Sequence, residues 1–270
     1  MLFTGLPGLS RRLRAWAAGV PSQCAVCHAW PAQRVCAACV ARFAAPAIRC
    51  QRCALRVPSG VLVCGACLHD PPVFDACLAA LDYAYPWADA LADFKFRADP
   101  GWAGTLSTLL RATPGVASAI AAADRVLPVP LSAQRLRERG FNQSALLAQP
   151  LAGAKTDART LLRRHATEAQ SGLPRAQRLR NLRGAFALAP PLAAALRGQR
   201  LVLLDDVMTT SATVHAATLA LREAGAAHVT VVVLARTAAS TAASQRAGNA
   251  PGSPDGKRSR SPCVAARNSA

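Results

Sequence analysis

Four Cys-x-x-Cys pairs constrain the first 70 residues of this chain more than any other feature of the sequence. They account for eight of its ten cysteines and are Cys24/Cys27, Cys36/Cys39, Cys50/Cys53 and Cys64/Cys67. Two residues between thiolates allow both sulfurs to reach one ion at about 2.3 Å, and two such pairs complete a tetrahedral four-sulfur site. The spacing therefore predicts two structural zinc sites, since four sulfurs leave no ligand position open for catalysis.

The sequence leaves the grouping of these pairs open. In a sequential grouping the first pair joins the second and the third joins the fourth, but an interleaved grouping satisfies the same spacing. A disulfide framework is the alternative to zinc, and it requires an oxidising compartment. The N-terminal segment places its apolar residues before its charges, which is the reverse of a secretory signal. We therefore predict zinc thiolates, with His28 and His69 as bystanders and Cys77 as a core residue.

The charge and hydropathy of the chain limit its partners. Lys and Arg number 32 against 14 Asp and Glu, which gives a formal net charge of +18. This imbalance favours an anionic partner such as a phosphate compound or a nucleic acid, and a basic tail in an Arg-rich composition is the alternative explanation. No apolar run reaches the roughly 18 residues that a membrane-spanning helix needs. We expect no membrane span and a cytoplasmic location.

Composition divides the chain into four segments. Residues 1–20 predict a short amphipathic lead-in, 21–70 a double zinc ribbon, 74–237 an α/β domain, and 238–270 a disordered tail rich in Ser, Gly, Pro and Arg. Alternating apolar strands and Ala/Leu helices in the third segment predict a parallel sheet with right-handed crossovers.

The expected elements of the α/β segment follow from its apolar periodicity. Strands are expected at 80–86, 125–130, 200–207 and 229–235, and helices at 87–96, 101–112, 142–152 and 213–224. Residues 163–183 are charged and irregular, which predicts a long exposed loop of the kind that is usually functional or disordered.

Residues 201–213 are the most informative segment for function. An apolar strand runs into two adjacent carboxylates, Asp205 and Asp206, and a hydroxyl-rich turn (residues 208–213) leads to a helix. The turn comprises Met208, Thr209, Thr210, Ser211, Ala212 and Thr213. Its backbone N–H groups, its hydroxyls and the positive end of the helix favour a phosphomonoester at the carboxyl edge of the sheet. The carboxylates suit sugar hydroxyls or a Mg²⁺ ion that bridges to phosphate oxygens.

This segment resembles the signature of type I phosphoribosyltransferases, which is an apolar strand, two acidic residues and then Thr-Thr-Gly-x-Thr. The resemblance implies that 5-phosphoribosyl-1-pyrophosphate (PRPP) binds with magnesium at the hydroxyl-rich turn, and that Asp205 and Asp206 are catalytic. Ser211 stands where the signature has Gly. If the position needs a positive φ, a Ser costs about 1 kcal/mol there.

Further blocks resemble the competence protein F (ComF) family, in which a cysteine-rich zinc head is joined to a phosphoribosyltransferase-like domain. The blocks are Tyr85-Pro86 with residues 94–96, then residues 126–130, then Arg-Glu-Arg-Gly-Phe-Asn-Gln at 137–143, and finally residues 163–186. The resemblance implies a type I phosphoribosyltransferase fold for 74–237 and a loop at 163–183 that closes over the leaving group. It also implies an association with uptake of single-stranded DNA in natural transformation, with DNA-uptake proteins as partners.

The arginines of the third block are candidate ligands of phosphate oxygens. Arg137 and Arg139, together with Arg135, carry forked donors that suit such oxygens. A solvated helix face is the alternative for all three. Lys95 is either a further phosphate contact or a surface lysine.

Two functions remain open on the sequence. In the first, the protein transfers a phosphoribosyl group from PRPP to an acceptor that no residue of the sequence identifies. In the second, it is a catalytically silent protein that binds single-stranded nucleic acid or acts as a scaffold, and retains the phosphate cradle.

Overall fold

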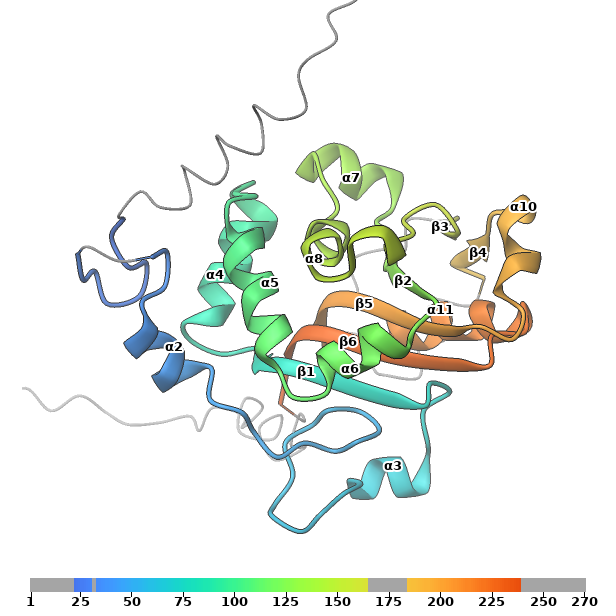
Figure 1. The fold of residues 1–270 in the computed structure, drawn as a ribbon, viewed down its shortest axis with the longest axis horizontal. Coiled ribbons are helices and arrows are strands. Elements are labelled where there is room, and N and C mark those ends of the chain that lie inside the picture. The colour runs from blue at the N-terminus through green and yellow to red at the C-terminus, as the bar shows by residue number, and fades with distance from the viewer. Residues whose placement is uncertain (1–21, 31–32, 165–183, 239–270) are drawn as a thin grey trace, which may run out of the picture. The chain divides into compact units, whose positions relative to one another are not determined.

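The centre of the fold is a four-stranded sheet in which all neighbouring strands are parallel (Figure 1). The computed structural model describes residues 22–30, 33–164 and 184–238. The strand order is β1-β6-β5-β2, formed by β1 (Ala76–Asp82), β6 (His228–Arg236), β5 (Arg200–Met208) and β2 (Arg125–Pro128). The two central strands are buried along most of their length, as is typical of parallel sheets covered on both faces. The predicted α/β fold with a parallel sheet is confirmed.

Alternate residues of the strands face two separate cores, because successive side chains of a strand point to opposite faces. Val202 and Leu204 of β5 face a core shared with four helices. These are α4 (Trp87–Phe96), α5 (Trp102–Ala112), α6 (Val116–Ala122) and α8 (Gln143–Ala152). Leu201 and Leu203 face the other core, which contains α11 (Ala212–Glu223).

Several described elements connect this framework. They are α7 (Ala133–Arg139), the 3₁₀ helices η1 (Gly153–Lys155) and η2 (Ala194–Leu196), α10 (Pro190–Ala193), and the antiparallel strands β3 (Leu161–Arg163) and β4 (Phe186–Leu188). The loop predicted at 163–183 lies, from residue 165 onward, outside the described residues. The strand pair that flanks it was not predicted, because three-residue strands carry too little periodicity to be recognised.

The helix predicted at 87–96 has those bounds, and the other predicted helices differ by one residue at their ends. The first strand was placed wrongly at 80–86, since β1 ends at Asp82. The aromatic residues Tyr83 and Tyr85 favoured a strand at 80–86, yet both are exposed in the connection to α4. The buried residues of β1 are small or sulfur-containing, with Cys77 and Ala79 among them, so their pattern is weak.

The cysteine-rich region contains two short helices, α2 (Ala37–Phe43) and α3 (Gly65–His69), each of which starts just after a cysteine. Cys24 and Cys39 belong to the same core as Trp87 of α4. The Trp87 indole Nε1 donates a hydrogen bond of 2.7 Å to the Phe43 carbonyl, which attaches this part of the region to α4. The later cysteines form a small cluster of their own.

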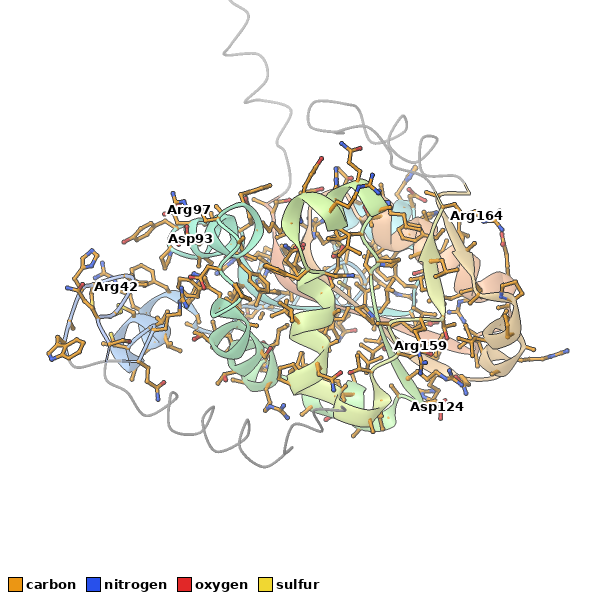
Figure 2. All side chains as sticks on the ribbon, turned by 90° about the horizontal axis from the view of Figure 1, so that it is seen from above. Arg42, Asp93, Arg97, Asp124, Arg159 and Arg164 are labelled. Carbon is orange, nitrogen blue, oxygen red and sulfur yellow. The ribbon has the colours of Figure 1, made fainter. Side chains whose placement is uncertain are left out.

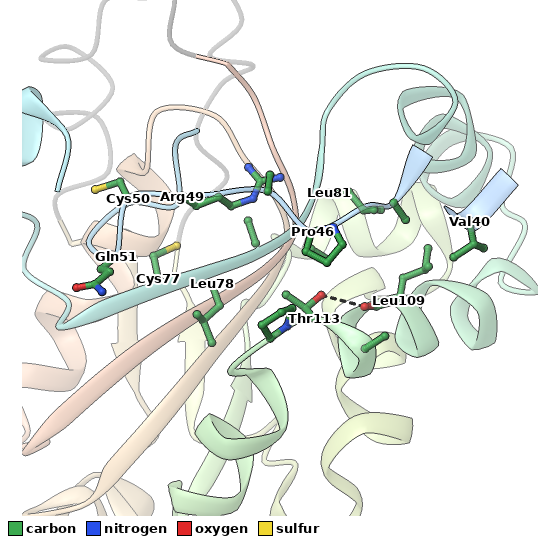
Figure 3. Close-up of a pocket in the computed structure, with 16 residues that line it drawn as sticks. Val40, Pro46, Arg49, Cys50, Gln51, Cys77, Leu78, Leu81, Leu109 and Thr113 are labelled. Atoms are coloured by element: carbon green, nitrogen blue, oxygen red, sulfur yellow. Dashed lines mark hydrogen bonds between the residues drawn. The ribbon is translucent and has the colours of Figure 1, made fainter. Parts of the chain in front are cut away.

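A mainly apolar pocket lies where the stretch 44–51 passes the outer strand β1 and the helix α5 (Figure 3). Pro46, Leu78 and Leu109 are among the residues that line it. Among the described helices, none is both long enough and apolar enough to span a bilayer.

Candidate functional site

Three neighbouring strands end in one row at the carboxyl edge of the sheet. Arg236 of β6 is in register with Met208 of β5 on one side and with Asp82 of β1 on the other. The hydroxyl-rich turn begins at Met208, the last residue of β5, and extends into the first residues of α11, which begins at Ala212. Ligands of open parallel sheets bind beyond this edge, so the segment singled out in the sequence lies at the expected place.

Asp205 is half-buried near the end of β5. Its Oδ1 accepts a hydrogen bond of 3.1 Å from the Ser144 hydroxyl of α8 and one of 2.9 Å from the Asp206 backbone N–H. Burial, followed by repulsion from the Asp206 carboxylate, raises the pKa of Asp205 to about 7. The Lys95 charge and the two hydrogen bonds act in the opposite direction without cancelling this rise.

Asp206 is buried, with 8% of its surface exposed, and is paired with a cation from a distant helix. The Lys95 ammonium of α4 lies 3.0 Å from Asp206 Oδ1, and the two side chains are only 15% and 12% exposed. Lys95 is therefore not a surface lysine, and the phosphate contact that the sequence also allowed stays a prediction. Its ammonium offsets part of the charge of the carboxylate pair (Asp205 and Asp206).

Further cations act on the carboxylate pair from α7 and β3. Desolvation lowers the pKa of Arg139, and the nearby negative charge of Asp206 opposes that shift. Desolvation also lowers the pKa of Arg163. The positive charge of Arg135 adds to this shift, whereas the negative charge of Asp205 opposes it. The Arg139 guanidinium donates to Gln143 Oε1 at 3.2 Å and lies 5.2 Å from the centre of the Phe96 ring. Three guanidinium groups from two elements thus share this edge.

The three arginines of α7 that were predicted as candidate phosphate ligands do not lie on one face of the helix. Arg135 and Arg139 are four residues apart and lie on one face of the helix. Arg137 is exposed and lies two residues from each, so it occupies another face. Arg163 was missed as a site residue, because only the tertiary structure brings β3 beside α7.

The hydroxyl-rich turn directs its apolar and polar side chains in different directions. Met208 and Ala212 are buried, at 2% and 3% exposure, while Thr209 is exposed and Thr210 and Thr213 are half-buried. Ser211 has a φ of 61° and a ψ of 0°, and its hydroxyl donates to the Thr210 carbonyl at 2.5 Å. The left-handed conformation explains why the signature has Gly at this position. Met208 and Ala212 can contribute only backbone N–H groups to a ligand.

The eight paired cysteines form two groups, and the grouping is sequential. The first cysteine group is Cys24, Cys27, Cys36 and Cys39, and the second cysteine group is Cys50, Cys53, Cys64 and Cys67. In each group the sulfurs lie within 4.8 Å of one another. The Cys27–Cys36 and Cys53–Cys64 sulfur pairs are both 3.6 Å apart, close to the ~3.8 Å that tetrahedral zinc–sulfur geometry requires.

Backbone N–H groups prepare one sulfur of each group for a metal. Burial opposes ionisation of Cys24, yet N–H donors from Cys27, Cys36 and Val26 lower its pKa to about 6. The same competition lowers the pKa of Cys50 to about 7. All nine cysteines of the described ranges are free thiols, so no disulfide competes with metal there. His28 and His69 are exposed and belong to neither group, and Cys77 is a buried core residue, as predicted.

The sequence of the chain is similar to those of several known proteins. A sequence profile described as "Phosphoribosyl transferase domain" matches residues 138–247. "DNA utilization protein YhgH" of Escherichia coli K12 is 35% identical over 231 residues, covering 81% of this chain and 98% of that protein. "Competence protein F" of Haemophilus influenzae is 30% identical over 193 residues, covering 69% and 84%. "Competence protein ComFC" of Bacillus subtilis is 35% identical over 113 residues, covering 42% and 44%.

The raised pKa of Asp205 predicts a pH-dependent gain in stability for Asp205→Asn. Between about pH 4 and pH 7 the folded protein holds a proton that the unfolded chain has lost, so wild-type stability falls as the pH rises through that interval. Asn keeps an accepting oxygen but carries no charge. In urea unfolding, the difference in free energy of unfolding between Asp205→Asn and wild type should increase by about 1–3 kcal/mol in favour of the variant from pH 5 to pH 8. An advantage equal at both pH values would contradict the interpretation.

The left-handed backbone at Ser211 predicts opposite behaviour of two small replacements. Both Ser211→Gly and Ser211→Ala remove the hydroxyl, so their difference reports the backbone conformation alone. The Gly variant is expected to be about 1 kcal/mol more stable than the Ala variant, because only Gly adopts a positive φ at low cost. Thermal unfolding measures this difference, and equal stabilities would show that the turn is not held left-handed in solution.

Proposed function

Because the chain belongs to the competence protein F (ComF) family, we propose that it binds PRPP at the hydroxyl-rich turn and takes part in the uptake and use of single-stranded DNA. The name "DNA utilization protein" belongs to its relatives and motivates the second half of this proposal. We also propose cytoplasmic residence and domain boundaries at 21–70 and 74–237. The lead-in predicted at 1–20 and, from residue 239 onward, the tail predicted at 238–270 lie outside the described residues.

The observation that carries the PRPP proposal is the carboxylate pair beside the hydroxyl-rich turn, held by Lys95 and surrounded by arginines. The turn suits the 5-phosphate, because N–H groups of the first helical turn lack intrahelical partners. The carboxylate oxygens suit the ribose hydroxyls, which are hydrogen-bond donors. Arg135, Arg139 and Arg163 suit the pyrophosphate, whose negative charge grows when it departs.

Magnesium fits the same set of residues. Oxygen donors are the ligands that Mg²⁺ prefers, and Asp205 and Asp206 would hold it through carboxylate oxygens together with the substrate. When bound, the ion would neutralise charge on the pyrophosphate. The residues of the chain have their own task, because the arginines would bind and orient the leaving group while Lys95 holds the Asp206 carboxylate in place.

The transferase reaction would break the bond between the ribose C1 and the pyrophosphate oxygen, leaving the electron pair on pyrophosphate. An acceptor with a lone pair then forms the new bond to C1 and gives up its proton. Exclusion of water would protect the cation-like sugar of this step from hydrolysis. The family resemblance motivates the proposal that residues 163–183 close over the site, although residues 165–183 lie outside the described part of the chain.

Titration calorimetry with PRPP and Mg²⁺ tests this proposal. Wild type should bind, and Asp206→Asn should lose at least tenfold in affinity, because the acceptor of ribose hydroxyls or metal is removed. The same variant should not lose affinity for inorganic phosphate, because removing a negative charge from the site does not weaken the binding of an anion. Asp93→Asn is the matched control, because Asp93 pairs with Arg97 at the surface of the helix that carries Lys95 (Figure 2). No PRPP binding by wild type would overturn the proposal.

The alternative function is single-stranded nucleic-acid binding by a catalytically silent protein. It is supported by the net charge of +18 and by Phe96, which is 72% exposed and faces the Arg139 guanidinium. An exposed ring beside a cation can stack on a base. Salt-dependent binding of a single-stranded oligonucleotide, combined with no heat from PRPP, would favour this alternative.

We propose further that each cysteine group holds one structural zinc ion. The purified protein should contain two zinc ions per chain by mass spectrometry of the metal. Cys36→Ser and Cys64→Ser are equivalent changes in the two groups, since the backbone N–H of each residue donates to a sulfur of its own group at 3.3 Å. Each variant should lose one equivalent and unfold at a lower temperature, because metal binding contributes to folding free energy. Two equivalents remaining in either variant would contradict the assignment.

A further inference from the structure

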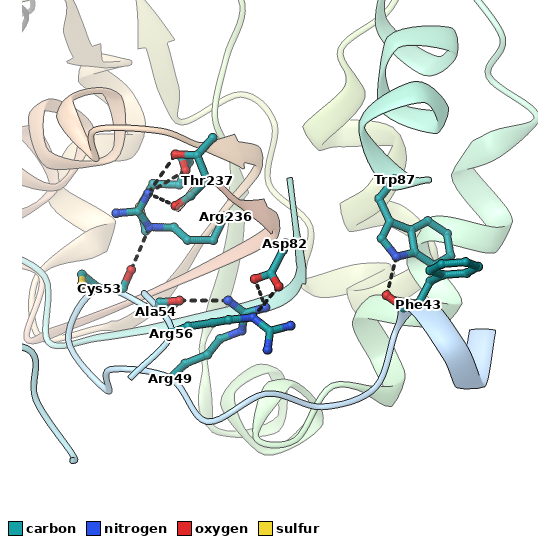
Figure 4. A network of polar contacts seen from close by, with 10 residues as sticks. Phe43, Arg49, Cys53, Ala54, Arg56, Asp82, Trp87, Arg236 and Thr237 are labelled. Atoms are coloured by element: carbon teal, nitrogen blue, oxygen red, sulfur yellow. Dashed lines mark hydrogen bonds and ion pairs between the residues drawn. The ribbon is translucent and has the colours of Figure 1, made fainter. Parts of the chain in front are cut away.

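Arg236 is a buried arginine that connects the second cysteine group to the hydroxyl-rich turn (Figure 4). It is the last residue of β6 and is 7% exposed. Its Nε donates to the Cys53 carbonyl at 3.1 Å, and its Nη1 donates to the Met208 carbonyl at 3.0 Å and to the Thr209 carbonyl. One side chain therefore contacts a cysteine of the second cysteine group, the last residue of β5 and the residue that follows it.

The hydrogen bonds of Arg236 join the end of β5 to the second cysteine group. The Met208 carbonyl also accepts a hydrogen bond of 3.2 Å from the Thr237 N–H, so the end of β5 is held by two donors from one short stretch. Nη1 reaches the Thr237 carbonyl as well, at 3.1 Å. Loss of one of these donors would weaken the hold on the backbone at the start of the turn, so that backbone depends in part on where this guanidinium lies.

The hydrogen-bond partners of Arg236 are carbonyl and hydroxyl oxygens, which carry no full charge. The guanidinium is therefore held by hydrogen-bond geometry, with the Cys53 carbonyl as one anchor and the Met208 and Thr209 carbonyls as the other. Because Cys53 belongs to the second cysteine group, a metal that fixes this group would also fix one of the two anchors.

The position of the Cys53 carbonyl also depends on how the second cysteine group is attached to the sheet. The Cys77 N–H of β1 donates to the Gln51 carbonyl at 3.1 Å. Arg49 and Arg56, which flank the Cys50–Cys53 pair, both form ion pairs with Asp82 at the end of β1 (Figure 4). The loop between the cysteines is thus fixed at the same edge of the sheet as the turn.

We propose that Arg236 is a positioning residue that couples metal binding at the second cysteine group to the conformation of the hydroxyl-rich turn, and hence to its affinity for PRPP. The PRPP part of this inference rests on the function proposed above, whereas the coupling to the turn does not. The first cysteine group contacts α4 instead, through Trp87 and Phe43 (Figure 4), so it provides a matched comparison.

Hydrogen exchange of the amides of residues 208–215 tests the coupling without any ligand. Cys64→Ser and Arg236→Met should each exchange these amides at least about fivefold faster than wild type, a factor typical of coupled sites. Cys36→Ser should leave them unchanged. Adding Cys64→Ser to Arg236→Met should cause no further increase, because both changes break the same connection. A merely structural role of Arg236 predicts additive effects, and that result would overturn the inference.

Calorimetry with PRPP and Mg²⁺ separates this inference from the proposed function. Cys64→Ser should lose at least about fivefold in PRPP affinity relative to Cys36→Ser, and by reciprocity PRPP should slow zinc transfer from the second group to a chelator in wild type but not in Arg236→Met. If wild type binds no PRPP while the exchange pattern holds, the proposed function fails and the coupling stands. If wild type binds and Cys64→Ser binds equally well, the coupling fails. Should Arg236→Met not fold, the comparison of Cys64→Ser with Cys36→Ser decides alone.

Discussion

Two adjacent carboxylates at the end of a buried strand repel each other, and much of the surrounding structure offsets that repulsion. Asp206 takes the ammonium of Lys95, and Asp205 takes hydrogen bonds from Ser144 and from the next backbone N–H. The compensation is incomplete, because the pKa of Asp205 still lies near 7. Such residual cost is typical of groups retained for binding a ligand and not for stability. A ligand such as the proposed PRPP, bound with Mg²⁺, would bring hydroxyl groups and a cation that offset the remaining repulsion between the two carboxylates.

The two cysteine groups attach to different parts of the α/β domain and therefore have different consequences for the site. The first shares a core with α4 and α5, and α4 carries Lys95. The second lies at the carboxyl edge, where Arg236 and Asp82 hold it against β6 and β1. The first group thus packs against a helix, whereas the second is joined to the turn by the Arg236 side chain.

The hydroxyl-rich turn combines a strained backbone position with two buried side chains. Ser211 adopts a backbone conformation that favours Gly, and the turn keeps Met208 and Ala212 buried while its threonines face outward. Burial of those two side chains fixes the backbone, so the N–H groups are oriented before a ligand arrives. Preorganised donors cost less to align on binding than flexible ones.

Short-range patterns in the sequence predicted the cysteine groups and most of the helices and strands around the sheet. The Cys-x-x-Cys spacing predicted two four-sulfur groups, and the strand followed by two acids and a hydroxyl-rich turn predicted a site at the carboxyl edge, because both patterns are short-range and depend on covalent spacing. The sequential grouping of the cysteines, the position of Arg139 near the carboxylate pair, the ion pair of Lys95 with Asp206 and the charge interaction of Arg163 with Asp205 could not be derived in this way. Arg236 and Cys53 are 183 residues apart, and Lys95 and Asp206 come from different elements. Only packing of the helices and the cysteine groups onto the sheet brings such residues together, because the direction of a side chain in space depends on where its whole element lies.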